Sequence, residues 1–460
     1  MSGEELDSFF EPDKVAVIGA SREGGKVGHS VLRNFVENRF EGEVYPVNPE
    51  ADEILGLESY DSVKDVPGEV DLAVVTVPPS VSNDVIRECV EEEVDAVVVI
   101  TSGYREIGGK GEERSEELKE ILEGEDTRAV GPNCLGVWDA YSRVDTLFLP
   151  SYKMKRPPEG EIAIVTQSGA FGSAVLDLLA DMEVGVSRFI SYGNQVDVTE
   201  EELVNWLEED EKTEAIAAYV EGASDGEKFL ETLKSVTDDM PVVALKGGKY
   251  GSGKEAVSSH TGSLAGSYHV YQGAFRQSGV VEAGSVEELF DYSRALTYNE
   301  PLEGKNIAVV TNGGGFGVLT ADALEREGLE LAEFSSASRK QLRKVVPDYG
   351  NVENPLDLVG DADNKRYEKA LNVIKNDENV DGVIIIPLLQ PLPLESDVVD
   401  TIVNFREDYD KPVAVCMTGG EFTELHRNNL EKNEVAAYPD PDRAAKAMKA
   451  LHSYGEWLDR

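Results

Sequence analysis

The chain has 460 residues, which is too long for one ordinary hydrophobic core, so we expect two to four domains. It carries 89 Asp and Glu against 43 Lys and Arg, and this formal net charge of -46 disfavours nucleic acid and anionic membranes as partners. The acidic residues are spread along the chain, which favours a protein adapted to high salt over an ordinary acidic cytosolic protein.

The three cysteines, Cys89, Cys134 and Cys416, lie far apart and form no CxxC pair. This spacing argues against a disulfide scaffold and a thiolate zinc site, and it fits a reducing cytoplasm. The first ten residues contain no apolar signal-peptide segment, and no apolar run reaches the length of a bilayer span. We therefore expect a cytoplasmic protein.

Short Val- and Ile-rich runs alternate with Gly-rich turns and amphipathic stretches along the whole chain. Such runs are typical of strands covered on both faces, and repeated strand–helix units predict parallel sheets with right-handed crossovers. The expected strands of the first region are Val15–Ile18, Val44–Val47, Leu72–Val77, Ala96–Ile100 and Arg128–Val130. Those of the second are Ile162–Thr166, Ser187–Ile190, Ala215–Val220, Val242–Leu245 and Val280–Val281. Those of the third are Ile307–Val310, Leu329–Phe334, Val383–Ile386, Val413–Cys416 and Val435–Ala437.

Two segments interrupt this alternation. Tyr152–Gly160 is rich in basic residues and proline, and Tyr298–Gly304 contains Pro301. We interpret both as linkers between domains. The expected domains are residues 1–151, 161–297 and 305–460.

The second and third regions open alike. Ile307–Gly317 repeats the pattern of Ile162–Gly172, with Thr, Phe and Gly at equal spacing. The shared positions favour an internal duplication over a chance similarity between two Gly-rich turns.

The first strand-to-helix turn, Gly19–Gly24, has the place of a phosphate-binding loop at a helix N-terminus. It departs from GxGxxG because Ser21 replaces the middle glycine. The second strand ends at Asn48, where dinucleotide folds usually carry an acidic residue for the ribose. This disfavours an NAD-linked oxidoreductase and favours another nucleotide. Val77–Pro79 and Thr101–Gly103 follow the next strands and are consistent with crevice residues or with ordinary loops.

Two later Gly-rich segments have competing interpretations. Thr166–Gly172 is either an anion site at a helix N-terminus or a tight turn with a capping serine. Gly248–Glu255 nearly spells a Walker A loop, but Glu255 stands where Ser or Thr would bind Mg²⁺. We therefore do not expect an ATP site there.

His260 lies in a run of small and hydroxyl residues, Ser258–Ser267. The residues alone leave four roles open: nucleophile, general base for a neighbouring serine, metal ligand, or plain loop histidine. No second His or Cys stands at metal-ligand spacing, and no GxSxG elbow is present. Glu221 ends an expected strand and is either a partner for an imidazole N–H or an ordinary loop acid.

Six motifs together resemble one family, the alpha subunits of ADP-forming acetate–CoA ligase (acetyl-CoA synthetase), within the acyl-CoA synthetase superfamily that includes succinyl-CoA synthetase. These motifs are GASREGGKVG at 19–28, PNCLG at 132–136, TQSGAFG at 166–172, YVEG at 219–222, SSHTGSLAGS at 258–267 and NPLDLVGDAD at 354–363. The resemblance covers essentially the whole chain. It implies three doubly wound α/β domains, a Rossmann-like CoA-binding domain followed by two flavodoxin-like ligase–CoA domains.

The resemblance also implies a reversible reaction in which acyl-CoA, ADP and phosphate give free acid, ATP and CoA. An acyl phosphate forms first and then phosphorylates His260, and Glu221 holds the imidazole. The ATP-grasp domains are implied to lie on a separate beta subunit in an α2β2 heterotetramer. Mg²⁺ is implied to enter with ADP or ATP, mainly on that partner chain, with no metal ligand from this one. With the acidic composition, the resemblance favours an archaeal, halophilic source.

On these grounds we predict two groups of binding residues besides His260 and Glu221. The CoA-binding group is Gly19, Ala20, Ser21, Gly24, Asn48, Val77, Pro78, Ile100, Thr101 and Asn133. The group for phosphate and the acyl moiety is Gln167, Ser168, Gly169, Ala170, Gly193 and Asn194. Acetate is the family default, since the spacing does not reveal the acyl pocket. The alternative function is a non-catalytic CoA-binding or regulatory module of the same fold.

Overall fold

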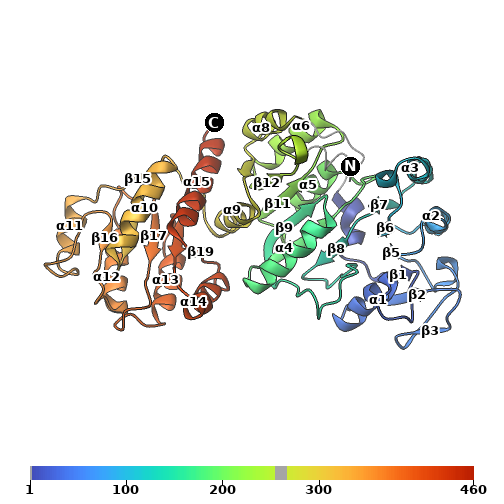
Figure 1. Cartoon of the computed structure of the whole chain (residues 1–460), viewed down its shortest axis with the longest axis horizontal. Coiled ribbons are helices and arrows are strands. Elements are labelled where there is room, and N and C mark those ends of the chain that lie inside the picture. The colour runs from blue at the N-terminus through green and yellow to red at the C-terminus, as the bar shows by residue number, and fades with distance from the viewer. Residues whose placement is uncertain (1–2, 254–266) are drawn as a thin grey trace. The chain divides into compact units, whose positions relative to one another are not determined.

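A computed structural model describes residues 3–253 and 267–460 (Figure 1). The chain divides into two compact units, Met1–Asp181 with Gly185–Ser278, and Met182–Val184 with Gly279–Arg460. Among the described residues, no helix is both long and apolar enough to cross a bilayer.

The first sheet is fully parallel and has the strand order β2-β1-β5-β6-β7. Its strands are β1 (Lys14–Ile18), β2 (Glu43–Val47), β5 (Leu72–Val75), β6 (Ala96–Val99) and β7 (Arg128–Val130). The helices of this region are η1 (Gly3–Phe9), α1 (Val27–Glu37), η2 (Val63–Asp65), α2 (Ser82–Glu91), η3 (Arg105–Ile107) and α3 (Lys110–Leu122), and a small hairpin joins β3 (Glu53–Ile54) to β4 (Leu57–Glu58). All residues of the central strands β5 and β6 are buried, as expected for strands covered on both faces, whereas the edge strand β2 is buried only at Pro46 and Val47.

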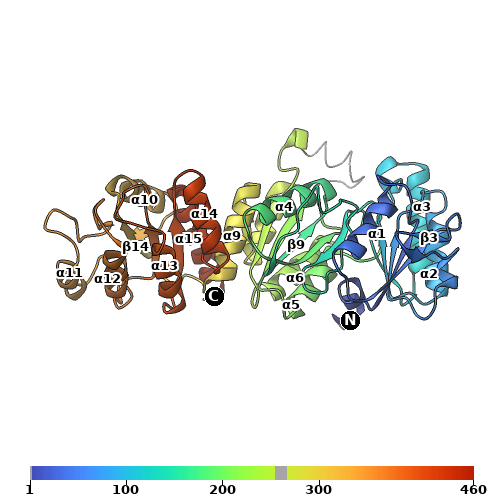
Figure 2. The ribbon, with the colours of Figure 1, turned by 90° about the horizontal axis from the view of Figure 1, so that it is seen from below.

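The second sheet has the order β12-β11-β9-β10-β8 within the first unit. Its strands are β8 (Gly136–Asp139), β9 (Glu159–Thr166), β10 (Val186–Ser191), β11 (Ala215–Val220) and β12 (Val242–Lys246). The helices are α4 (Gly169–Asp181), α5 (Glu200–Glu209), α6 (Gly226–Val236) and α8 (Tyr268–Gln277). Figure 2 shows α4 on one face of this sheet and α5 and α6 on the other.

The second unit contains the third sheet, with the order β15-β14-β17-β18-β19 and with β16 beside β14. The strands of this sheet are β14 (Asn306–Thr311), β15 (Glu330–Leu331), β16 (Leu356–Asp357), β17 (Gly382–Ile386), β18 (Val413–Cys416) and β19 (Ala437–Tyr438). The second unit also contains the short strand β13 (Val281–Ala283), which lies outside this sheet. The helices are α9 (Val286–Tyr298), α10 (Gly314–Arg326), α11 (Ser336–Leu342), α12 (Asn364–Ile374), α13 (Val398–Glu407), α14 (Glu421–Glu431) and α15 (Pro441–Leu458).

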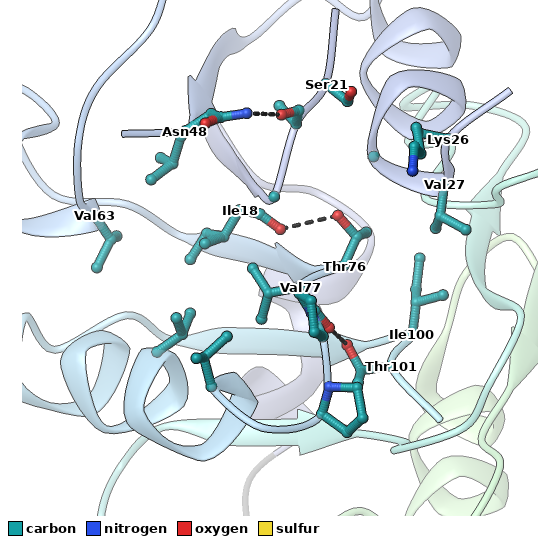
Figure 3. Close-up of a pocket in the computed structure, with 18 of the residues that line it drawn as sticks. Ile18, Ser21, Lys26, Val27, Asn48, Val63, Thr76, Val77, Ile100 and Thr101 are labelled. Atoms are coloured by element: carbon teal, nitrogen blue, oxygen red, sulfur yellow. Dashed lines mark hydrogen bonds between the residues drawn. The ribbon is translucent and has the colours of Figure 1, made fainter. Parts of the chain in front are cut away.

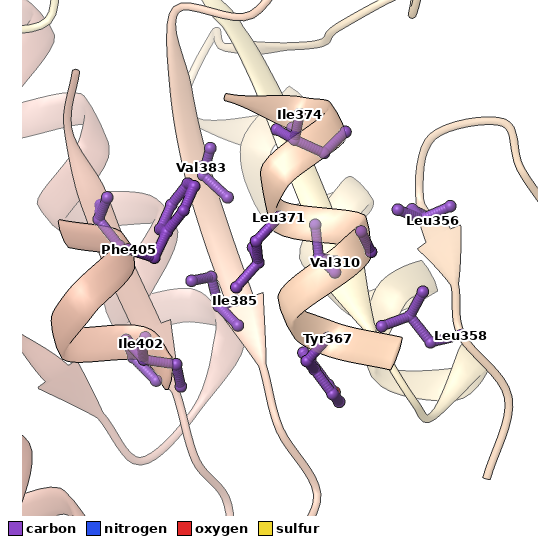
Figure 4. Close-up of a cluster of buried hydrophobic side chains, with 14 of the residues drawn as sticks. Val310, Leu356, Leu358, Tyr367, Leu371, Ile374, Val383, Ile385, Ile402 and Phe405 are labelled. Atoms are coloured by element: carbon purple, nitrogen blue, oxygen red, sulfur yellow. The ribbon is translucent and has the colours of Figure 1, made fainter. Parts of the chain in front are cut away.

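One buried cluster shows how this third sheet is covered. Figure 4 shows Val310 of β14 and Ile385 of β17 packed against Leu371 of α12 and Phe405 of α13. All four side chains are buried, so the sheet face and the helices exclude water from one another. The apolar runs that predicted the strands are therefore the runs that build the core.

The predicted α/β architecture of three sheets with parallel strands is confirmed, with differences at the edges. Leu329–Phe334 forms only the two-residue strand β15, because Ala332 and Phe334 turn into the core instead of extending the ladder. The expected strand Val435–Ala437 is shifted to β19. The sequence analysis missed β3, β4, β8 and β16, which are short and bring no apolar run of their own. β8 pairs antiparallel with β10, so this strand follows the first sheet in sequence but belongs to the second.

Candidate functional site

A cavity of about 970 Å³ opens at the carboxyl ends of the first sheet (Figure 3). In a parallel sheet this edge is the usual place for a ligand. Nine of the ten residues predicted to bind CoA line it, namely Gly19, Ala20, Ser21, Asn48, Val77, Pro78, Ile100, Thr101 and Asn133. Gly24 is not among the lining residues.

The first strand-to-helix turn is shaped by two glycines that have no room for a side chain. Gly19 has φ of +90°, and a Cβ on Gly28 would lie 2.1 Å from the Gly19 carbonyl oxygen. Close packing of Gly28 on Gly19 therefore brings the start of α1 directly against the turn. The free N–H groups of the first helical turn consequently lie at the cavity, where they favour an anion.

Polar side chains at the strand ends are used to shape the cavity. The Asn48 amide donates to the Ala20 carbonyl at 2.7 Å and accepts from the Glu50 N–H at 2.8 Å. Thr76 donates to the Ile18 carbonyl at 3.0 Å, and Thr101 donates to the Val77 carbonyl at 2.8 Å. Asn48 thus fastens the first turn to the second strand, a role that the sequence analysis did not foresee.

The sequence analysis also missed Lys26, which lines the same cavity. Lys26 is the exposed N-cap residue of α1, and Figure 3 shows its side chain beside Val27, the first residue of the helix. A cation beside a helix N-terminus suits a phosphate group. The signal was present in the sequence, since a lysine closes the Gly-rich turn of a strongly acidic chain.

At the carboxyl edge of the second sheet, Gln167 joins two neighbouring turns. Its side-chain oxygen accepts the N–H groups of Glu221 and, at 3.0 Å, Gly222. Its side-chain nitrogen donates to the Gly222 carbonyl at 2.9 Å. Ser168 accepts the N–H of Phe171 at 3.3 Å and so caps α4, which begins with Gly169 and Ala170. Gln167 is therefore a bridge that fixes the turn carrying Glu221.

The segment Glu221–Ser224, called here the acidic turn, is held by further side chains. The N–H of Ala223 donates to the Tyr271 hydroxyl at 2.7 Å, and the N–H of Ser224 donates to Glu200 at 3.2 Å. The Lys246 ammonium donates to the Glu221 carbonyl at 2.7 Å. Fixed side chains from α5, β12 and α8 thus bind this short backbone segment.

Acidic groups and burial set the electrostatics around this turn. Burial, and then the charge of Glu221, raise the pKa of Tyr219 to about 12. Burial, and then the charge of the adjacent Glu201, raise the pKa of Glu200 to about 7. Burial also raises the pKa of Tyr271. The phenols therefore stay protonated near neutral pH, and Glu200 changes its charge there.

Two asparagines connect the cavity to the second sheet. Asn133 lines the cavity and donates to the Asn194 side chain at 3.4 Å. The Asn194 amide in turn donates to Glu106 at 2.6 Å, and its N–H donates to the Pro132 carbonyl at 2.8 Å. Gly193 has φ of +55°, and a Cβ there would lie 2.4 Å from the same carbonyl oxygen. The loop after β10 is thereby packed directly onto the PNCLG segment.

The predicted site residues thus fall into two groups in one compact unit. Nine of the ten residues of the CoA group line the cavity, and Gln167, Ser168, Gly193 and Asn194 lie at strand ends of the second sheet. His260 lies outside the described residues, and so does the end of the Walker-like segment from Lys254 onward. Within residues 3–253 and 267–460, no three His, Cys, Asp or Glu side chains are grouped to hold a metal ion.

Three family models match consecutive parts of the chain. They describe a CoA-binding domain over residues 13–139, a succinyl-CoA-ligase-like flavodoxin domain over 159–296, and a ligase–CoA domain over 307–457. The alpha subunit of acetate–CoA ligase (ADP-forming) II from Pyrococcus furiosus is 38% identical over 450 residues, which are 97% of each chain. Acetate–CoA ligase (ADP-forming) I from Archaeoglobus fulgidus is 39% identical over 98% of this chain, which spans 64% of that longer protein.

A solved structure gives the same result for the fold. It is the dinucleotide forming acetyl-coenzyme A synthetase 1 of Ca. Korarchaeum cryptofilum, in complex with phosphate and ADP. Its TM-score with this chain is 0.92 at 35% sequence identity, and the match covers 99% of this chain and 98% of the other.

Proposed function

The chain belongs to the family of alpha subunits of ADP-forming acetate–CoA ligases, and from this premise we propose how its residues take part in the reaction. Acyl-CoA binds in the cavity of the first sheet, with its phosphates near Lys26 and the start of α1. Phosphate then attacks the thioester carbonyl carbon, a C–O bond forms, and the C–S bond breaks to release CoA. Acetyl is the acyl group that the names of the relatives support.

We propose that His260 then carries the phosphoryl group. Its imidazole nitrogen attacks the phosphorus of the acyl phosphate, and the P–O bond to the departing carboxylate breaks. Glu221 accepts a hydrogen bond from the other ring N–H and keeps the attacking nitrogen unprotonated. The phosphohistidine finally passes its phosphoryl group to ADP, which regenerates the neutral imidazole.

The observation that carries this proposal is the hydrogen bond between Asn133 and Asn194. It links a residue of the CoA cavity to the loop after β10, and Gln195 of the same loop accepts a hydrogen bond from Gln167 at 3.4 Å. A thioester leaving the cavity would meet N–H groups and a carboxylate in the same compact unit. These are the groups that acyl phosphate formation and phosphohistidine chemistry need.

We also propose the assembly and setting of the enzyme. The subunit names of the relatives support a beta partner, which we expect to carry the ATP-grasp domains in an α2β2 heterotetramer and to hold Mg²⁺ with ADP. The net charge of -46 supports a halophilic, archaeal source. Cys89, Cys134 and Cys416 are free and buried, in keeping with a reducing cytoplasm. The three family-model matches support domains near residues 1–151, 161–297 and 305–460.

The test is phosphorylation of the reconstituted complex with acetyl-CoA and radiolabelled phosphate. We expect an acid-labile label on the alpha chain, and we expect His260→Ala to abolish it. His269→Ala is the matched control, because His269 is an exposed histidine of α8. Label that persists on His260→Ala would refute the histidine assignment. CoA binding without any label on the wild-type chain would instead support the non-catalytic CoA-binding module.

A further inference from the structure

We propose that Lys246 and Tyr271 are positioning residues that hold the acidic turn in place for phosphoryl transfer. The inference rests on the proposed role of Glu221 as the carboxylate partner of His260. Neither residue belongs to the motifs that identify the family. In the sequence, one precedes His260 and the other follows it.

The acidic turn is bound by side chains along its whole length. Beyond β11, Gln167 accepts the first two N–H groups of the turn, Tyr271 accepts the third and Glu200 accepts the fourth. Lys246 binds the carbonyl of the first residue. The position of a turn held in this way depends on those side chains, because the β-ladder ends at Val220. Displacing one of them displaces the carboxylate of Glu221.

Lys246 and Tyr271 act as a pair. The Lys246 side chain is only 2% exposed, and its ammonium also donates to the Gly247 carbonyl. The ammonium lies 4.7 Å from the centroid of the Tyr271 ring, so a cation–π contact adds to the hydrogen bonds. Tyr271 therefore supports the acidic turn twice, through its hydroxyl on Ala223 and through its ring on Lys246.

Burial of the Lys246 ammonium is energetically unfavourable in itself. Removing a charged amine from water is unfavourable unless hydrogen bonds and nearby charges compensate for the lost hydration. The third sheet of the same chain has the same arrangement of strands and turns. It shows whether this arrangement forms without a buried ammonium.

The register of the strands aligns the two frames. Thr166 lies opposite Tyr219 in the second sheet, and Thr311 lies opposite Ile386 in the third. Glu221 lies two residues after Tyr219 of β11, and Leu388 lies two residues after Ile386 of β17. Leu388 therefore takes the place of Glu221, the first residue of the acidic turn.

The neighbouring strand completes the alignment. Tyr219 lies opposite Leu245, the residue before Lys246. Ile385 lies opposite Val415, so Ile386, the counterpart of Tyr219, aligns with Cys416. Met417, the next residue, therefore takes the place of Lys246. Met417 is fully buried. The frame thus folds with two apolar side chains where the second region has a carboxylate and an ammonium. Since the third region forms the same frame without an ammonium, we assign Lys246 to the positioning of the acidic turn.

The first variant is Lys246→Met, which copies the third region. With the reconstituted α and β chains, we expect kcat for ATP formation to fall about 100-fold. The KM for acetyl-CoA should stay within about twofold, because the cavity lies at the first sheet. Lys246→Arg keeps the cation and should recover about tenfold of the lost kcat.

The second variant guards against a Lys246→Met chain that does not fold. Tyr271→Phe keeps the ring over the ammonium but loses the acceptor for the Ala223 N–H, and we expect kcat to fall about tenfold. Tyr141→Phe is the matched control, since the Tyr141 hydroxyl also binds one backbone group of the same unit, the Gly160 carbonyl, at 3.1 Å. The control should keep the wild-type kcat and KM.

Failures of the two proposals give different results. If His260→Ala abolishes the label while Tyr271→Phe and folded Lys246→Met keep wild-type kcat, the positioning role is wrong and the phosphohistidine stands. A KM for acetyl-CoA that rises together with the loss of kcat would also overturn the positioning role. If the wild-type chain never carries the label, the proposed function itself is wrong.

Discussion

The second and third sheets of this chain begin with the same strand-to-helix turn. In both, a threonine at the end of the first strand accepts an N–H two residues ahead at 3.0 Å, Thr166 from Ser168 and Thr311 from Gly313. In both, the residue after the threonine uses its side-chain amide to bind the loop after a neighbouring strand. Gln167 binds the loop after β11, and Asn312 binds the loop after β17. The duplication that the sequence suggested therefore extends to individual hydrogen bonds.

The two frames differ in what the amide binds. Gln167 holds a turn that begins with Glu221, whereas Asn312 donates to the Leu388 carbonyl at 3.0 Å and accepts its N–H at 2.8 Å. Asn312 also accepts the hydroxyl of the buried Tyr367 at 2.9 Å. The same backbone arrangement thus carries ionisable side chains in one region and apolar side chains in the other. The fold supplies the frame, and a few side chains supply the chemistry.

The largest effect should come from making the second region resemble the third. Glu221→Leu gives the acidic turn the leucine that the third region has at position 388, and it removes the proposed partner of His260. We expect kcat for ATP formation to fall at least about 100-fold, measured in the reconstituted complex. Glu227→Gln is the control, because Glu227 is an exposed acid of α6. A Glu221→Leu enzyme with near wild-type turnover would break the comparison.

The next effect separates the two amides that hold the frames. Gln167→Ala frees the acidic turn, and we expect kcat to fall by about tenfold or more. Asn312→Ala leaves the half-buried Leu388 N–H without its side-chain partner and leaves the Tyr367 hydroxyl with only the Ile386 carbonyl, at 3.0 Å. This loss should lower the free energy of unfolding by about 1–2 kcal/mol. Denaturant unfolding and steady-state kinetics on both variants test this. A larger loss of kcat in Asn312→Ala than in Gln167→Ala would contradict it.

A smaller effect concerns the cavity at the first sheet, which should respond independently of the acidic turn. Lys26→Ala removes the cation beside the start of α1, and we expect the KM for acetyl-CoA to rise about fivefold to tenfold at low salt with kcat unchanged. The rise should shrink as salt screens the contact. Lys234→Ala, an exposed lysine of α6, serves as the control. An unchanged KM would exclude Lys26 as a CoA ligand.

The last effect concerns stability and not turnover, and it is a pH dependence at Glu200. Its pKa is raised from 4.5 to about 7 by burial and then by Glu201, so the folded state binds this proton more tightly than the unfolded state. The resulting stabilisation is complete below pH 4.5 and is lost as pH rises through 7, with an upper limit of about 3 kcal/mol. Glu200→Gln should therefore lose less stability than the wild type between pH 5 and 8 in urea unfolding. Equal losses in both proteins would contradict the assignment.

The sequence predicted most strands of the three sheets because buried parallel strands are short apolar runs with clear ends, and it missed β8 and β16, which are short. Nine of the ten residues that it predicted to bind CoA line the cavity, since strand ends of a parallel sheet meet at one edge. It did not reveal Lys246, which looks like a loop residue after an apolar strand, or Tyr271, which follows on a separate helix. Their pairing arises from the approach of β12 and α8, which no local pattern records.

The antiparallel pairing of β8 with β10 matters for anyone who dissects the chain. A fragment ending at residue 151 would carry Gly136–Asp139 without its partner strand, and the remainder would expose the edge of β10. Unpaired edges of this kind attract other chains, so both fragments should aggregate. Cutting before Pro132 keeps the strand with its sheet. The pairing of β8 with β10 therefore links the first two α/β domains, which a sequence alignment would separate.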